Sequence, residues 1–352
     1  MDNLLAGNGI APEFPPAQLE IRTAYEPTVF PSLGRHHLIY ELHLLNFGDR
    51  PIALDAIEAL DADSYEPFAC LQRHQLDIRT IGTTHGESDP QARRILDCGR
   101  RAVAFVFLSV DADVGIPGKL RHRIVSDARS VVGPAIATRS TALRVLGAPV
   151  EGPGWTAVSG PGNDSHHRTG VFVVDGVARI SRRYAIDWKK IRDGASFLGD
   201  ARDVRCYHTY GENVIAVADG TVVAAVDGLP DNVPRTRAGF EPAVPTTMAT
   251  IAGNSLAIDL GHGQFAFYAH LQAHSLRVAT GDRVRCGQPL ARVGNSGDAR
   301  EPHLHFQVAD APDALAAEGL PYLIDRYRLR LPDGRATVRT QELPLAGMRV
   351  DF

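Results

Sequence analysis

Short runs in which apolar and polar residues alternate dominate the chain, and turn residues separate them. In the first 140 residues, 19–23 alternates, 37–45 does so in part, and further strand-like runs lie at 52–60, 101–108 and 118–126. Successive side chains of a β-strand point to opposite faces of a sheet, so this alternation predicts strands. Several short strands with turns between them predict an antiparallel β-sandwich of immunoglobulin-like type.

The second half of the chain has the same character, with three predicted hairpins. Two of them turn at Asp-Gly pairs, 175–176 and 219–220, which are strong hairpin signals between apolar runs. The third joins 255–260 to 264–270, and late strands are expected near 326–330 and 335–340. We therefore expect an all-β protein.

Length and glycine and proline content indicate the domain organisation. The 352 residues exceed the roughly 100–200 of a typical domain, so two domains are expected. Glycine and proline are dense between 146 and 163, where no periodicity survives. We predict an accessory β-sandwich over 1–140, a linker over 141–165 and a second domain over 166–352.

Charge and hydropathy exclude several classes of partner. The formal charge is −4 and no basic block occurs, which argues against nucleic acid as a main partner. No apolar run reaches the ~18–20 residues of a membrane span. The N-terminal residues lack a positive segment followed by an apolar core, so no signal peptide is visible. The composition indicates no oligomeric state.

Candidate chemistry lies in the alternating segment 303–308, which follows a Gly-Asn-Ser-Gly turn at 294–297. As a strand, this segment places His303, His305 and Gln307 on one face and three apolar residues on the other. Two imidazoles on one face suit a metal site in which one is a ligand and the other faces an activated water. Six other histidines show no ligand spacing, and we expect them at the surface or at sheet edges: His36, His37, His43, His74, His85 and His122.

These motifs, with others upstream, resemble the lysostaphin-type (LytM-type) zinc endopeptidases. The resemblance covers about 160 to 325 and rests on blocks in matching order, at 216–223, 253–254, 268–271, 281–288 and 294–306. It implies a lysostaphin-like antiparallel sheet, one zinc ion per chain and a peptidoglycan stem or cross-bridge as the substrate. It also implies a periplasmic or secreted location.

The resemblance further implies a set of site residues. Asp187 and His305 match two zinc ligands, and His270 and His303 match two catalytic histidines that are not ligands. At the usual position of the third ligand stands Arg183, which cannot bind a metal.

Two adjacent histidines could replace the missing ligand. The resemblance favours His167, whereas strand parity from the Asp175-Gly176 turn puts His166 on the face of Asp187. We predict zinc ligation by His167, Asp187 and His305, with His166 as the alternative and His208 as a weaker third choice.

Two other functions stay open from the sequence. Arg183 motivates the first, a catalytically inactive relative that binds cell wall or a partner protein. The second is a metal-dependent hydrolase that acts on carbohydrate. The polar loop at 228–249 is expected to border the active site.

Overall fold

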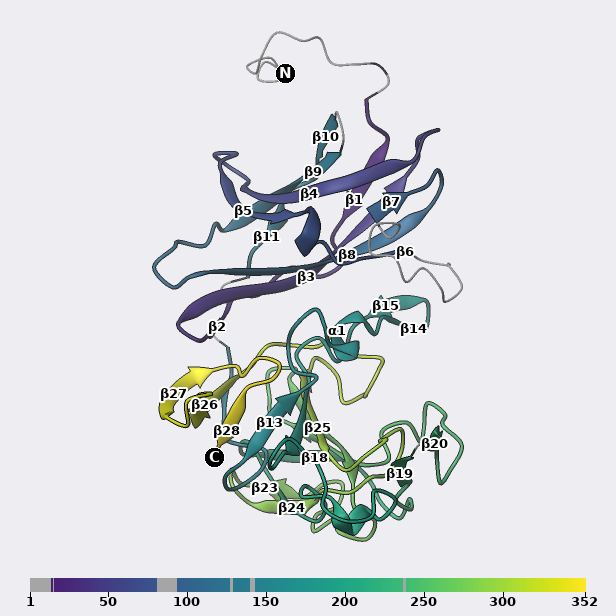
Figure 1. Ribbon diagram of the computed structural model, residues 1–352, viewed down its shortest axis with the longest axis vertical. Coiled ribbons are helices and arrows are strands. Elements are labelled where there is room, and N and C mark those ends of the chain that lie inside the picture. The colour runs from purple at the N-terminus through teal and green to yellow at the C-terminus, as the bar shows by residue number, and fades with distance from the viewer. Residues whose placement is uncertain (1–13, 15, 81–93, 127–128, 140–142, 237–238) are drawn as a thin grey trace. The chain divides into compact units, whose positions relative to one another are not determined.

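The computed structural model describes residues 14, 16–80, 94–126, 129–139, 143–236 and 239–352. The chain divides into two compact units: the first is Met1–Thr28 with Leu38–Ser140, and the second is Val29–His37 with Thr141–Phe352. The regular secondary structure of both units is almost all β-strand (Figure 1), which confirms the expected all-β fold. No helix in the described ranges is long and apolar enough to cross a membrane.

The strands of the N-terminal half form two antiparallel sheets. One has the order β1-β3-β8-β6, with β2 paired to β3, and the other the order β10-β9-β4-β5, with β11 on β9 and β7 on β4. Their bounds are β1 Leu19–Arg22, β2 Phe30–Ser32, β3 Arg35–Asn46, β4 Ile52–Asp61, β5 Pro67–Gln72, β6 Ile78–Thr80, β7 Ile95–Leu96, β8 Arg101–Asp111, β9 Lys119–Ser126, β10 Arg129–Val132 and β11 Ile136–Ala137, with a short 3-10 helix η1 at Arg73–Gln75. The five strands predicted from alternation are confirmed. The immunoglobulin-like connection of the sandwich stays a prediction.

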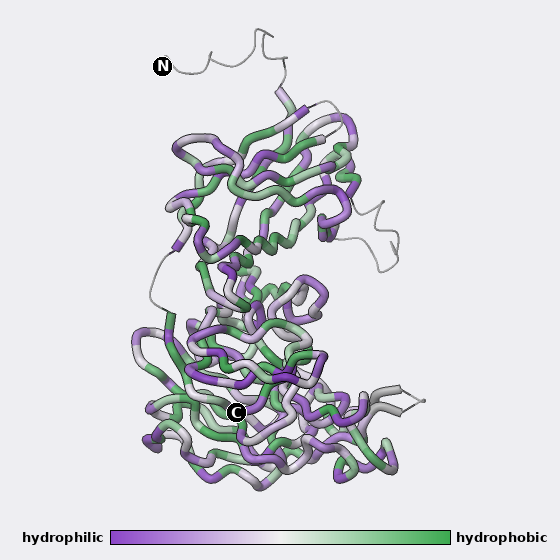
Figure 2. Tube along the Cα trace, turned by 60° about the vertical axis from the view of Figure 1, so that its left-hand side comes forward, coloured by the Kyte–Doolittle hydropathy of each residue, from purple (hydrophilic) through white to green (hydrophobic). Residues whose placement is uncertain are grey.

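Buried and more exposed residues alternate along some strands of this unit, and the buried ones belong to its core. Along β9, Leu120, His122 and Ile124 are buried while their neighbours are more exposed. Hydrophobic and hydrophilic residues are interspersed along the chain (Figure 2). The inward face of β9 therefore includes a histidine among aliphatic side chains.

Two of the scattered histidines are not where the sequence analysis puts them. His37 and His122 are only 3% and 1% exposed, so the surface prediction is wrong for both. The ring nitrogen Nε2 of His122 lies 2.7 Å from the Tyr40 hydroxyl of β3, which satisfies it inside the core. His85 lies outside the described residues.

The buried His122 predicts a loss of stability in acid. Burial lowers its pKa from 6.5 to about 4, so protonation favours the unfolded chain. The stabilisation is complete above pH 6.5 and is lost as the pH falls toward 4, by roughly 3 kcal/mol at pH 4. Hydrogen exchange of β9, corrected for the intrinsic rates, should show this loss between pH 7 and pH 4.5.

Two variants check the assignment. His122→Gln keeps a polar group facing Tyr40 and should flatten the pH dependence, whereas His74→Gln, at an exposed site, should leave it unchanged. An unchanged pH dependence in His122→Gln would show that another group causes it.

The second unit is organised around one large sheet. Its order is β12-β26-β28-β13-β16-β25-β22-β21-β18-β23, with β27 paired to β26. The bounds are β12 Val145–Leu146, β13 Trp155–Val158, β16 Ile186–Lys190, β18 Gly220–Val226, β21 Asn254–Asp259, β22 Phe265–Leu271, β23 Arg283–Val284, β25 Leu304–Ala309, β26 Leu323–Arg330, β27 Ala336–Glu342 and β28 Arg349–Asp351. All pairings in it are antiparallel except that of β12 with β26.

Three small ribbons and two short helices complete this unit. The ribbons pair β14 Phe172–Val174 with β15 Val177–Arg179, β17 Asn213–Ile215 with β24 Pro289–Arg292, and β19 Val233–Thr236 with β20 Gly239–Glu241. The helices are α1 His166–Thr169 and the 3-10 helix η3 Val204–Cys206.

The stretch expected as a linker, 141–165, contributes strands to this sheet. In β13, Trp155 and Ala157 are fully buried, and the strand pairs with β16 on one side and β28 on the other. The segment Val29–His37 also belongs to this unit, where Phe30 meets the ring of Tyr184 at 5.7 Å. The stretch 141–165 is therefore part of the second unit, because its apolar residues are buried in the sheet although it is rich in glycine and proline.

Two of the three predicted hairpins are confirmed. β14 and β15 pair across the Asp175-Gly176 turn, in which both residues have positive φ, and β21 pairs with β22. The hairpin at Asp219-Gly220 is wrong, because β17 pairs with β24 while β18 pairs with β21 and β23. The late strands β26 and β27 are confirmed.

Candidate active site

Two neighbouring strands bring Asp187 and His305 together. Asp187 lies in β16 and His305 in β25, and the two residues are direct cross-strand partners. The ring nitrogen Nδ1 of His305 lies 3.0 Å from Oδ1 of Asp187. Both side chains are buried, at 4% and 6% exposure, so the sheet fixes a carboxylate beside an imidazole out of bulk water.

Alternation along β25 orients His305. Nε2 of His305 lies 2.9 Å from Oε1 of Gln307, two residues further along the same face. The predicted shared face is therefore confirmed for this pair. His303 immediately precedes the strand, and its Nε2 lies 3.4 Å from Oδ1 of Asp187.

His167 reaches the same carboxylate from α1. Ser165 caps this helix by accepting a hydrogen bond from the His167 amide, at 3.2 Å. Nδ1 of His167 is 2.9 Å from the carbonyl of Ser159, and its Nε2 is 3.4 Å from Oδ1 of Asp187. The residues preceding β14 are thus helical, and the strand parity that favoured His166 does not apply.

His270 enters the site through a strained backbone. It sits in β22 with φ of +63°, a left-handed conformation that is uncommon outside glycine. The register of β21 against β22 shifts between Asn254 and Leu256. Nδ1 of His270 is held 2.9 Å from the carbonyl of Ser296. Strain of this kind concentrates at functional sites, where the surroundings enforce it.

The Gly-Asn-Ser-Gly turn supplies that carbonyl and leaves no room for side chains at its end. Gly297 has φ of +71°, and a Cβ atom there would lie 2.3 Å from the amide nitrogen of Gly253. Oγ of Ser296 accepts from the Asn254 amide at 2.9 Å and donates to the carbonyl of Leu271 at 2.8 Å. This contact locks the turn against the end of β22, beside His270.

The four histidines share one feature. Each has one ring nitrogen against an oxygen acceptor: the carbonyls of Ser159, Ser296 and Glu301 for His167, His270 and His303, and the amide oxygen of Gln307 for His305. If that nitrogen carries the N–H, the other nitrogen of a neutral ring has a lone pair that a metal ion can accept. In His305 the other nitrogen, Nδ1, also faces an oxygen, Oδ1 of Asp187 at 3.0 Å. Such partners fix the tautomer of metal-binding histidines.

Ring nitrogens of His167 and His305 converge on one carboxylate oxygen. Oδ1 of Asp187 faces Nδ1 of His305 at 3.0 Å and Nε2 of His167 at 3.4 Å. Two atoms that bind a tetrahedral zinc ion at about 2.0–2.1 Å are separated by roughly 3.3 Å. A group of acceptors at this spacing suits a cation, and His, His and Asp are ordinary zinc ligands. The donor set therefore fits zinc.

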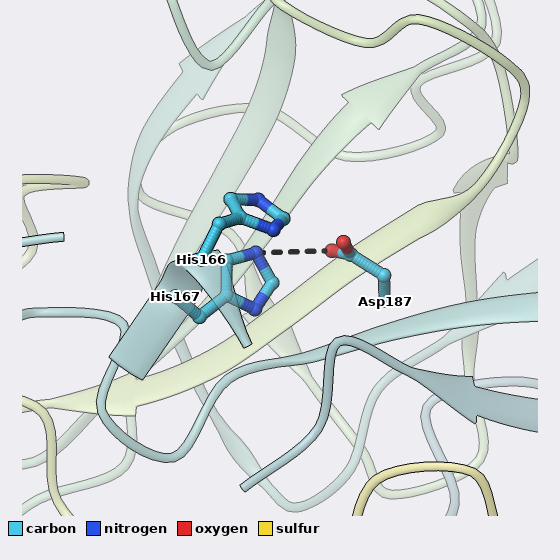
Figure 3. A group of neighbouring side chains, drawn as sticks. All are labelled: His166, His167 and Asp187. Carbon is cyan, nitrogen blue, oxygen red and sulfur yellow. Dashed lines mark ion pairs between the residues drawn. The ribbon is translucent and has the colours of Figure 1, made fainter. Parts of the chain in front are cut away.

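His166 also lies close to this group. Its ligand atom and those of His167 and Asp187 all lie within 4.8 Å of one another, and Figure 3 shows both rings next to the carboxylate. His166 is exposed, whereas His167 is 2% exposed and fixed by Ser159. Both histidines thus lie within reach of the carboxylate, and only His167 is buried and oriented by a carbonyl.

The protonation states suit metal binding. Burial lowers the pKa of His167 well below 6.5, and burial also lowers that of His270. Burial opposes ionisation of Asp187, but the facing His167 and His303 outweigh it and hold the pKa of this carboxyl well below its usual range. An ionised carboxylate and a His167 ring that burial disfavours from charging are forms that bind metals.

All five predicted site residues line one cavity of about 670 Å³, together with His166 and charged residues such as Arg182 and Asp298. His208 is not among its lining residues, and neither is any described residue of 228–249, although Ile251 and Ala252 are. Arg183 does not line it either: its guanidinium is buried and ion-paired with Glu318.

The groups that orient the imidazoles are not among the site residues predicted from the sequence. Gln307 was visible on the histidine face of the alternating strand, but its contact with His305 was not predicted. The carbonyl groups of Ser159, Ser296 and Glu301 leave no signal in a sequence, because every residue has one.

Comparison with known proteins assigns part of this unit to a family. Residues 202–316 match peptidase family M23. The chain carries an M23 peptidase domain. This confirms the resemblance to lysostaphin-type enzymes in the C-terminal half. The M23 match includes His270, His303 and His305, whereas His167 and Asp187 precede it.

The chain is also similar to individual proteins. A stretch of 134 residues is 31% identical to the peptidoglycan DD-endopeptidase ShyA of Vibrio cholerae serotype O1, and it spans 38% of this chain but only 28% of that protein. The catalytic domain of lysostaphin from Staphylococcus simulans is 20% identical at a TM-score of 0.26, covering 47% of this chain and 88% of that chain. A zinc-containing peptidase from Vibrio cholerae is 14% identical at a TM-score of 0.28, covering 86% of each chain.

The two adjacent histidines can be told apart by metal content. His167→Ala should lower zinc occupancy, whereas His166→Ala should keep about one zinc per chain, because only His167 is buried and oriented by a carbonyl. Zinc measured by mass spectrometry after dialysis checks both variants. Loss of zinc in His166→Ala alone would reverse the assignment.

Proposed function

We propose that the protein is a zinc-dependent endopeptidase that hydrolyses peptide bonds of bacterial peptidoglycan, in its stems or cross-bridges. The observation that carries this proposal is the convergence of His167, Asp187, His305, His270 and His303 on one cavity. The match to peptidase family M23 and the similarity to a peptidoglycan DD-endopeptidase support it. Such a substrate requires a location outside the cytoplasm, either periplasmic or secreted.

In this proposal, His167, Asp187 and His305 hold a single zinc ion. When bound, zinc supplies a Lewis acid that polarises the scissile carbonyl and makes water acidic enough to attack at neutral pH. The hydrogen bonds from His167 to Ser159 and from His305 to Gln307 keep the ligating nitrogens aimed at the ion. The buried sheet face keeps the ligands from rearranging.

His270 and His303 serve as proton carriers. Each has Nδ1 held by a carbonyl, which leaves Nε2 for the reacting groups. Their ring centroids are 4.8 Å apart, so both flank the same place. One can take a proton from the attacking water and return it to the amine that leaves, and the other can donate a hydrogen bond to the developing oxyanion.

The alternative of an inactive binding protein rested on Arg183. Arg183 is ion-paired with Glu318 and does not line the cavity. An inactive relative would lack a third metal ligand beside Asp187, whereas His167 lies there in this protein. No observation in the described residues favours the alternative. It remains an outcome of the experiment.

Digestion of purified peptidoglycan tests the function. The wild-type protein should release new free amino groups, and His305→Ala or prior removal of zinc by a chelator should stop the release. New reducing ends in place of amino groups would indicate a carbohydrate hydrolase. Binding without release of either would leave a cell-wall-binding protein.

A further inference from the structure

Arg182 is a charged residue of the cavity that the proposed reaction does not use. It lines the cavity with the histidines and is half-buried. Its Nε–H is buried and has no hydrogen-bond partner among the described residues. Within the same ranges, no carboxylate lies within the 4 Å of an ion pair. A buried N–H without a partner costs free energy that a ligand could recover.

The surroundings fix the guanidinium in place without neutralising it. Its Cζ lies 5.4 Å from the centre of the Phe172 ring, which is a cation–π contact. On another side the guanidinium lies against the backbone of Gly170, where a Cβ atom would be 2.5 Å from Nη2. The arginine is thus held by a ring and a backbone, neither of which is an anion.

The nearby charges place Arg182 next to the reaction. The charges of Asp187 and Asp298 both act on it, opposing the lowering of its pKa by burial. It also acts on the imidazoles of His166 and His167. Zinc bound by Asp187 would take up the charge of that carboxylate. Asp298 would then be the anion that still acts on Arg182, and no ion pair joins the two among the described residues, so the guanidinium could bind a closer anion in the cavity.

We propose that Arg182 binds a free carboxylate of the peptide substrate, close to the amide that is cut. The inference rests on the proposed peptidase function and refines its substrate class. A planar guanidinium can give two parallel hydrogen bonds to a carboxylate, which an amide or ester in the same place cannot accept with equal strength. The enzyme would then prefer peptides with a free carboxylate beside the scissile bond over the amidated peptides.

Equilibrium binding tests this without turnover. In a zinc-loaded His303→Ala protein, Kd is measured by fluorescence anisotropy for a labelled peptide that ends in D-alanyl-D-alanine, with a free carboxylate or a terminal amide. We expect the free acid to bind about 10- to 100-fold more tightly. Adding Arg182→Gln should abolish this preference and leave the affinity for the amide unchanged. Arg182→Lys should restore part of it.

Three controls make the result decisive. Arg326→Gln removes an exposed arginine outside the cavity and should keep the preference. Zinc content and thermal unfolding verify that Arg182→Gln is folded and loaded. A preference that survives Arg182→Gln would mean that the metal alone binds the carboxylate, and equal losses for both peptides would indicate a general positioning role. Either result overturns the proposal.

The failure of this inference is distinct from failure of the proposed function. Peptidoglycan digestion by the wild-type protein reports on hydrolysis, whereas the anisotropy comparison reports on recognition in a protein that does not turn over. Digestion together with equal affinities for the two peptides would reject the role of Arg182 alone.

Discussion

Asp187→Ala should abolish stoichiometric zinc binding and lower peptide hydrolysis by about 10³-fold or more, since a metal ion contributes several kcal/mol to such a reaction. Oδ1 of Asp187 is the atom on which the nitrogens of His167, His303 and His305 converge, at 3.0 to 3.4 Å. Removing it leaves imidazoles without the one anionic ligand of the set. Zinc per chain and the release of amino groups from peptidoglycan measure the two effects.

A matched variant distinguishes loss of the site from the nonspecific effect of removing one negative charge. Asp325→Ala removes an exposed carboxylate of β26 and should retain both zinc and activity. Asp187→Asn keeps the shape of the side chain and should also lose zinc, which would exclude a mere packing defect. One firmly held zinc in Asp187→Ala would show that the metal lies elsewhere and would remove the basis of the proposed mechanism.

Much of the site could be predicted because it rests on β-strands. Period-two alternation is a local property, so the face shared by His305 and Gln307 could be derived from a few residues. The pairing of Asp187 with His305 is not local: 118 positions separate them. Only the resemblance to a known family linked them before the structure did.

The predictions that were wrong or missing concern features that depend on distant partners or on very short segments. Alternation predicts a strand at β17 but not its partner, and β17 pairs with β24, about 75 positions away, in place of the adjacent β18. The helix α1 has four residues, too few for any periodic signal, and depends on the Ser165 cap. His122 looked like a surface residue because its partner, the Tyr40 hydroxyl, lies 82 positions away.

His303→Ala should separate catalysis from metal binding. We expect zinc to stay at about one per chain while hydrolysis falls by about 10²- to 10⁴-fold, the usual contribution of a general acid–base. The reason is positional: Nδ1 of His303 is held 2.8 Å from the carbonyl of Glu301, and its Nε2 faces the cavity beside the carboxylate of Asp187. Zinc content and amino-group release from the same preparation measure both quantities.

Comparing the zinc content of His303→Ala with that of Asp187→Ala tests whether His303 is a ligand. If the two variants lose zinc to the same extent, His303 is a ligand, and the set of His167, Asp187 and His305 must be revised. His208→Ala is the matched control, because His208 lies in the same unit but does not line the cavity, and it should retain zinc and activity. Full activity in His303→Ala would leave His270 as the sole proton carrier, which its carbonyl-held Nδ1 and free Nε2 would permit.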